Sequence, residues 1–242
     1  MATAAARLFT PWWAVLLTLT GVVLCGSAGF WQLNRAAEKR VLQQQFATAA
    51  RDVAARRLVA DTEAPAQRYQ WLRLAGYYLP EHQVLLDNLS FKGQSGYQVL
   101  TPFSTKMGRV LVNRGWLPAA GDRSVLPDVQ VSAEPREVLG RIDWLPQPGL
   151  VLAPTSIPAE APWPRRLLFP TATVLRAQTG LPLRDYQLLL APEMPDGYTR
   201  EWQPGGMGPE RHLAYAVQWF GLAVTVVVIH GVLALRNAKR TP

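Results

Sequence analysis

The sequence predicts a membrane protein in which two transmembrane helices flank one exported α+β domain with a mainly antiparallel β core. Two observations carry this prediction. An uncharged apolar run lies near each end of the chain, and the stretch between the runs alternates short β-type segments with turn signals. The composition agrees, because 49% of the residues are hydrophobic and only 17% are charged, which is low for a soluble protein.

The two apolar runs are long enough to cross a bilayer, which takes about 20 helical residues. The first extends from Pro11 to Leu33 without a charge, and the second, from Leu213 to Leu235, is interrupted only by His230. A cleaved signal peptide is the alternative for the first run. Its apolar stretch exceeds the usual h-region of about 7–15 residues, so we expect a retained helix.

The distribution of charge gives the orientation. All 17 acidic residues lie between the two runs, whereas the flanks carry only basic residues. By the positive-inside rule both ends of the chain then face the cytoplasm. The expected division is a cytoplasmic N-terminus at 1–10, a first transmembrane helix at 11–33, a periplasmic domain at 34–211, a second transmembrane helix at 212–235 and a cytoplasmic tail at 236–242.

The domain between the spans shows local signals for one long helix, six strands and one short helix. Alanine and long polar side chains predict that the first helix continues from Arg35 to Val59. Capping residues at both ends predict a short helix from Thr171 to Gly180. The expected strands are Trp71–Leu79, Gln83–Leu89, Tyr97–Phe103 and Arg109–Leu117, arranged as an antiparallel meander, followed by Arg136–Trp144 and Asp185–Leu190.

Three smaller features of the domain are also predicted. The proline-rich stretch from Pro146 to Pro170 is expected to be surface loop. Asp87 and Asn88 are expected to end a strand and form its turn. Gly115 is expected to end another strand where no side chain fits, with Trp116 packed on the core.

The residue inventory excludes several classes of function. The net charge of +8 is scattered rather than gathered in a basic stripe, so we expect contact with membrane lipid and no nucleic-acid binding. The single cysteine, Cys25, lies in the first span, which rules out paired-thiol metal or redox sites. His82 is the one histidine well inside the domain, and a lone histidine in a strand region indicates no catalytic site. We therefore expect no enzyme.

The second span carries the most informative cluster. His212, Tyr215 and Trp219 follow an i, i+3, i+7 spacing and share one helix face at its outer end, with Arg211 beside them. One interpretation is an interfacial belt of amphipathic rings. The other is a haem site, with imidazole on the iron, aromatic rings beside the macrocycle and Arg211 near a propionate. His230 lies five turns away and cannot reach the same iron.

The first span carries a face of small residues that favours close helix packing. Gly21, Cys25 and Gly29 recur every four residues along it. The spacing alone leaves open whether this face packs on the second span or on a partner protein.

Three ordered motifs resemble the surfeit locus protein 1 family. The N-terminal motif contains Gly29, Trp31, Gln32 and Arg35. The central motif runs from Gly96 to Pro118 and contains Tyr97, Pro102, Asn113, Arg114, Gly115 and Trp116, and the C-terminal motif runs from Arg211 to Leu222 and contains His212, Tyr215 and Trp219.

The resemblance implies a cytochrome c oxidase assembly factor of the bacterial inner membrane. It implies that the protein binds haem a through His212 and helps insert it into the catalytic subunit. The catalytic subunit is then a partner, and haem a synthase is open as a second. The alternative is a haem-free membrane scaffold that stabilises an oxidase assembly intermediate.

The orientation is testable with fused reporters. We expect a reporter fused after Pro242 to be active only if it functions in the cytoplasm, because Arg236, Lys239 and Arg240 hold that end inside. The same reporter inserted between the spans at Gly121 is the control and should show the opposite activity. A periplasm-dependent reporter that is active after Pro242 would contradict this orientation.

Overall fold

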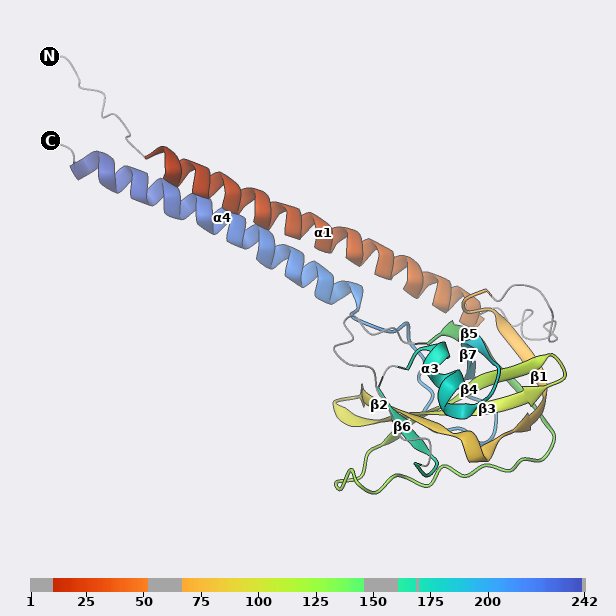
Figure 1. The fold of residues 1–242 in the computed structure, drawn as a ribbon. Helices are drawn as coiled ribbons and strands as arrows, with labels where there is room; N and C mark the ends of the chain where they lie inside the picture. Colours follow the sequence, from red (N-terminus) through yellow and green to blue (C-terminus); the bar gives the residue numbers. More distant parts are fainter. Residues whose placement is uncertain (1–10, 52–66, 146–160, 169, 241–242) are drawn as a thin grey trace, which may run out of the picture. The chain divides into compact units, whose positions relative to one another are not determined.

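The computed structural model describes residues 11–51, 67–145, 161–168 and 170–240. They form two compact units: one combines Met1–Gln44 with Pro204–Pro242, and the other is Gln45–Gln203. Figure 1 shows the two long helices of the first unit and the β-rich second unit. The predicted arrangement, with long apolar helices on either side of a β-rich domain, is confirmed.

The first unit is an antiparallel pair of helices, α1 (Trp12–Arg51) and α4 (Pro209–Arg240), which lie side by side (Figure 1). Both are long and apolar enough to cross a membrane. One series of less exposed positions of α1 alternates by four and three residues, a period of 3.5 that is typical of a coiled-coil seam. These α1 positions are Thr18, Val22, Cys25, Gly29, Gln32, Ala36 and Lys39.

The small-residue face of α1 packs on α4. A Cβ atom placed on Gly29 would lie 2.7 Å from the ring of Phe220, so this position admits no side chain. Phe220 also meets Phe30 edge to face, with 5.4 Å between the ring centroids. Gly21 is less constrained, because a Cβ atom there would lie 3.5 Å from Val226, an ordinary contact distance. Gly29 is therefore the residue that permits the close approach of the two helices.

The second unit is built on a closed β-barrel. Strand β1 (Trp71–Tyr78) pairs with both β3 (Gln94–Thr105) and β5 (Arg136–Trp144), and the ring continues through β7 (Leu183–Leu190) and β4 (Gly108–Pro118) back to β3. All these pairs are antiparallel except β4–β7, which is parallel. The chain between β4 and β7 contains β5, β6 (Arg165–Leu167) and α3 (Ala172–Thr179), so it is long enough for the crossover that a parallel pair requires.

Two further strands extend the sheet beyond the ring. Strand β2 (Val84–Phe91) pairs with β3 in antiparallel fashion, and β6 (Arg165–Leu167) pairs with β2 in parallel. The predicted meander is therefore correct for β2, β3 and β4. It is wrong for β1, which pairs with β3 and β5 instead of β2. The prediction of a mainly antiparallel core is confirmed, whereas the closure of the barrel was not predicted.

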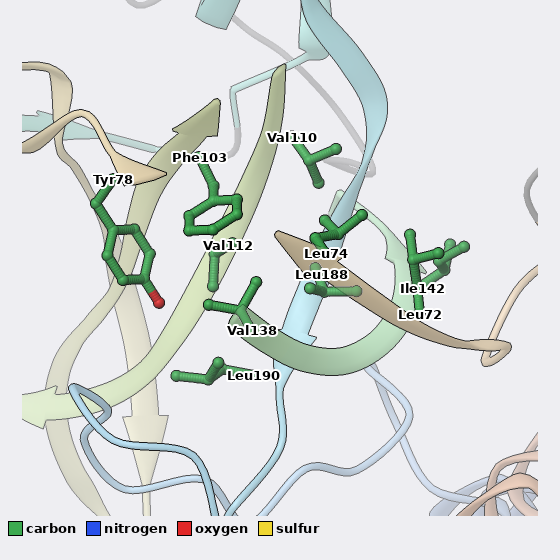
Figure 2. Packing of buried hydrophobic residues seen from close by; sticks show 10 residues of the cluster. All are labelled: Leu72, Leu74, Tyr78, Phe103, Val110, Val112, Val138, Ile142, Leu188 and Leu190. Carbon is green, nitrogen blue, oxygen red and sulfur yellow. The ribbon is translucent and has the colours of Figure 1, made fainter. Parts of the chain in front are cut away.

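The interior of the barrel is filled by aliphatic side chains around two aromatic rings. Tyr78 and Phe103 are fully buried and meet edge to face, with 5.0 Å between centroids. Figure 2 shows these rings among branched side chains from β1, β4, β5 and β7. Burial raises the pKa of Tyr78 to about 12, because the phenolate would have to form away from water.

Several local predictions are confirmed and several are wrong. α3 has Thr171 as its N-cap and left-handed Gly180 after its end, as expected. β6 lies inside the stretch that was expected to be surface loop. The sequence does not reveal it, because a strand of three residues between prolines leaves no periodic signal. Asp87 lies within β2 at a register shift and pairs with Arg123, so it does not form a turn. α1 is described to Arg51, and the remaining predicted helix at 52–59 falls outside the described residues.

Gly115 is required by its backbone and by its surroundings. Its φ of +110° is a conformation that residues with a side chain rarely adopt. A Cβ atom there would also lie 2.7 Å from the carbonyl oxygen of Thr199. The strand was expected to end at Gly115, but β4 continues to Pro118. Trp116 is buried, as expected, and its Nε1 donates to the Leu89 carbonyl oxygen at 3.1 Å.

We expect Gly115→Glu to lower the free energy of unfolding of the domain by about 3 kcal/mol or more, since it combines a strained φ with a buried charge. Thermal unfolding and protease resistance of the full-length protein measure the effect. Gly121→Glu is the matched control, because no atom lies within 4 Å of its Cβ position, and it should change stability by no more than about 0.5 kcal/mol. Equal stability of the two variants would show that Gly115 is not required.

Candidate functional site

The candidate site lies at the start of α4, within the helix-pair unit. Pro209 occupies the first position of α4, where a missing N–H costs nothing and the fixed φ suits the helix. Acidic Glu210 follows in the first turn, where the helix dipole favours a negative charge. These signals begin the helix just before His212, so that its side chain lies on the first turn.

His212 lies on the seam between the two helices and pairs with Gln32 of α1. Its Nδ1 is 2.7 Å from Gln32 Oε1, and both side chains are buried, with His212 only 8% exposed. Gln32 lies three residues beyond Gly29, the position of closest helix approach. The N-terminal and C-terminal motifs of the sequence, 180 residues apart along the chain, therefore meet in one hydrogen bond.

This hydrogen bond assigns the proton on the imidazole. An amide oxygen only accepts, so the Nδ1 of His212 must carry the hydrogen. Nε2 then keeps its lone pair in the neutral ring, and it has no hydrogen-bond partner in the described residues. Histidines that bind metal ions commonly donate their other N–H to a carbonyl or carboxylate oxygen in this way, which fixes both tautomer and ring orientation.

The three neighbours of His212 predicted from the sequence lie around it on α4. Trp219 is half-buried on the seam, two turns further along the helix. Tyr215 is 43% exposed, and Arg211 is exposed. Within the described part of the chain, none of the three is hydrogen-bonded to His212; Arg211 and Tyr215 lie within one turn of it on α4, and Trp219 lies two turns away.

The other members of the N-terminal motif lie beside the site on α1. Trp31 is 57% exposed next to buried Gln32. Arg35, one turn further out, forms an ion pair with Glu38 at 2.6 Å. Gly29 makes the close contact with Phe220 described above. In this motif, therefore, Gln32 contacts the histidine and Gly29 sets the distance between the helices.

The central motif belongs to the barrel unit and ties its loops together. Buried Arg114 donates to Gln83 Oε1 at 2.9 Å and to three carbonyl oxygens, of Asp196 at 2.7 Å, Val129 at 2.8 Å and Gln130 at 3.4 Å. Its guanidinium also lies over the ring of Tyr198, 5.2 Å from the centroid. A cation held by that many acceptors in the interior is structural, because few of its donors remain free.

The remaining members of the central motif have similar structural roles. Asn113 Nδ2 donates to the side-chain oxygens of Gln98 and Gln187, both at 2.9 Å, which links β3, β4 and β7. Tyr97 is fully buried under β2, and Pro102 lies opposite Leu111 in the β3–β4 pair. These contacts explain the motif through the fold of the barrel.

The structure also shows the surroundings of the two histidines outside the site, which the sequence did not predict. His82 ends a short 3-10 helix (Pro80–His82) rather than lying in a strand, and its ring meets Trp163 edge to face. His230 faces α1, with its Nδ1 2.9 Å from Thr18 Oγ1. Since the Thr18 hydroxyl donates to the carbonyl oxygen of Ala14, the Nδ1 of His230 must be the donor to Thr18.

Sequence reasoning identified His212 but missed what holds it. A signal was available, because Thr18, Cys25, Gln32 and Lys39 repeat every seven residues on α1. Polar residues that share a heptad position with a member of the small-residue face also lie on the seam, so each is expected to contact a side chain of the other helix. Among the described residues there is no group of three His, Cys, Asp or Glu side chains that could hold a metal ion. His212 is therefore not part of a cluster of that kind in the described part of the chain.

Comparison with known proteins agrees with the motifs. The profile of the SURF1 family matches residues 19–224, a range that contains all three motifs. A SURF1-like protein of Rickettsia bellii is 28% identical over 229 residues, which cover 89% of this chain and 87% of that protein. An uncharacterised SURF1-like protein of Mycobacterium tuberculosis is 25% identical over 255 residues, covering 97% of this chain and 88% of that protein. Both similarities extend over the helices and the barrel.

The assigned tautomer is testable by nuclear magnetic resonance on protein with isotope-labelled histidine. We expect His212 to carry its proton on Nδ1 in the neutral form, and Gln32→Leu to return it toward the Nε2-protonated form that free neutral imidazole favours. Gln44→Leu, an exposed amide on the same helix, should leave His212 unchanged. Identical His212 signals in wild type and Gln32→Leu would contradict the assignment.

Proposed function

We propose that this chain, which belongs to the SURF1 family, binds haem a at the outer ends of α1 and α4 and assists its insertion into the catalytic subunit of cytochrome c oxidase. The family membership rests on the profile match over residues 19–224. Proteins of this family are assembly factors tied to cytochrome c oxidase and are not known as enzymes. Haem a is cargo in this proposal, a substrate that the protein receives and releases.

The observation that carries the proposal is the pairing of His212 with Gln32. A neutral imidazole whose Nδ1 proton is engaged offers Nε2 to an iron ion, in an orientation fixed before the cargo arrives. The two residues come from separate family motifs and lie where Gly29 lets the helices approach closely. A purely structural histidine would not need its unprotonated nitrogen left without a partner.

The neighbouring residues suit a flat apolar cargo. Tyr215 and Trp219 provide aromatic surface one and two turns beyond His212 along α4. Exposed Arg211 provides a cation for an anionic group. Affinity in this arrangement comes mainly from burying the ring and its isoprenoid tail, while the imidazole fixes the position of the iron. A single protein ligand holds the cargo weakly enough for transfer.

The proposed setting is the bacterial inner membrane. Both helices cross it, the barrel unit lies in the periplasm and both ends of the chain are cytoplasmic. His212 then lies at the outer face, where propionates reach water while the ring stays in lipid. The proposed partners are the catalytic subunit, as acceptor, and haem a synthase, as a candidate donor.

The test is to co-express the protein with haem a synthesis and to record absorption spectra at matched protein levels. We expect pigment in the wild type, and a shifted or abolished pigment spectrum in His212→Ala without loss of thermal stability of the barrel. His230→Ala should keep the wild-type spectrum, because the two histidines are 18 residues, about 27 Å, apart on α4.

Equal pigment with identical spectra in wild type and His212→Ala would rule out ligation by this residue. Absence of pigment from the wild type itself would favour the haem-free scaffold, which stabilises an oxidase assembly intermediate. In that case, cells that lack the protein should lose an oxidase assembly intermediate, and this loss would identify the scaffold role.

A further inference from the structure

Lys39 is a cation on the helix seam that forms no ion pair with any residue the structure describes. It lies at the same heptad position of α1 as Gln32 and is half-buried. Its Nζ donates to the carbonyl oxygen of Gly205, in the loop before α4, at 3.2 Å. Among the described residues Lys39 forms no ion pair with a carboxylate. The hydrogen bond to Gly205 is exposed, and an ammonium group that meets one carbonyl oxygen has two further donors for another acceptor.

The loop before α4 is shaped to accept this ammonium group. Gly206 has a φ of +91°, which favours glycine. A Cβ atom at Gly206 would lie 3.0 Å from the Nζ of Lys39, so a side chain there would crowd it. The backbone of Gly205 and Gly206 therefore approaches the lysine closely and leaves room for Nζ beside the loop that precedes α4.

The position of Lys39 along the helix axis, relative to His212, also suits contact with a haem propionate. Gln32 marks the level of the imidazole, and Lys39 is seven residues further out on the same face, about 10 Å along the helix axis. A haem ring carries its iron at the centre and both propionates at one edge. With the iron at His212 and that edge turned toward water, the propionates point toward the end of the seam where Lys39 lies.

We propose that Lys39 binds a propionate carboxylate of the haem cargo and so sets which edge of the ring faces outward. The proposal rests on the proposed function. Arg211 remains the cation for the other propionate, whereas Arg35 is already paired with Glu38 and Arg40 is exposed and lies off the seam. Among the described residues at this end of the helix pair, Lys39 combines a place on the seam with a hydrogen bond to Gly205 and no ion pair.

The experiment compares haem a with its dimethyl ester, in which both propionates are uncharged. Full-length protein purified without haem in detergent micelles is titrated with each compound, and dissociation constants come from absorption and tryptophan fluorescence. The variants are Lys39→Met, which keeps the length of the side chain without its charge, and Arg40→Met, which removes an exposed neighbouring charge.

We expect the wild type to bind haem a more tightly than the ester, and Lys39→Met to reduce that preference about tenfold, as for loss of one charge-assisted hydrogen bond. Binding of the ester should be equal in wild type and Lys39→Met, which also shows that the variant is folded. Arg40→Met should keep the wild-type preference. For each protein the quantity compared is the ratio of its dissociation constants for the ester and for haem a, so the different solubility of the two compounds cancels between proteins.

The outcomes separate this inference from the proposed function. If the wild type takes up neither compound, the proposed function fails. If the wild type binds haem a through His212 and Lys39→Met keeps the full preference for the free acid, the propionate contact is wrong while the haem site stands. A wild type that does not distinguish the two compounds would equally overturn the role of Lys39.

Discussion

The close approach of α1 and α4 at Gly29 is the constraint on which the candidate site depends. With a side chain there, either the ring of Phe220 would have to shift or the two helices would have to separate, and separation would stretch the hydrogen bond between Gln32 and His212. Because Gln32 and His212 are buried away from water, breaking their hydrogen bond would leave two polar groups without a partner. The same closeness lets Thr18 reach His230 near the other end of the pair. Each histidine of α4 is thus held by a side chain of α1.

The barrel unit is stabilised by a different device, a buried cation that several loops share. Arg114 links the loop at Val129 and the loop at Asp196 to the strands, and Tyr198 N donates to its carbonyl oxygen at 2.7 Å. A buried guanidinium is favourable only if nearly all of its donors find acceptors. Two of the three family motifs therefore form the helix site, and the third serves the fold of a separate unit.

The features that could be predicted from the sequence are those that local signals determine. The two apolar runs, the capped helix α3 and most strand positions follow from composition, caps and alternation. Closure of the barrel could not be predicted, because it depends on β1 pairing with both β3 and β5, which no local pattern specifies. At the site, His212 could be recognised from its place on α4. Its partner Gln32 lies on another helix, and only the seven-residue repeat of α1 indicates which residues face the seam.

The heptad seam also limits how these proteins change in length during evolution. Inserting or deleting one residue between Thr18 and Lys39 would rotate every later position by about 100° and turn Gln32 and Lys39 off the seam. Seven inserted residues would restore the face but move Lys39 outward by about 10 Å relative to Thr18. Divergent family members are therefore expected to keep the spacing from Thr18 to Lys39 constant, while gaps in their alignments accumulate in the connections between strands of the barrel.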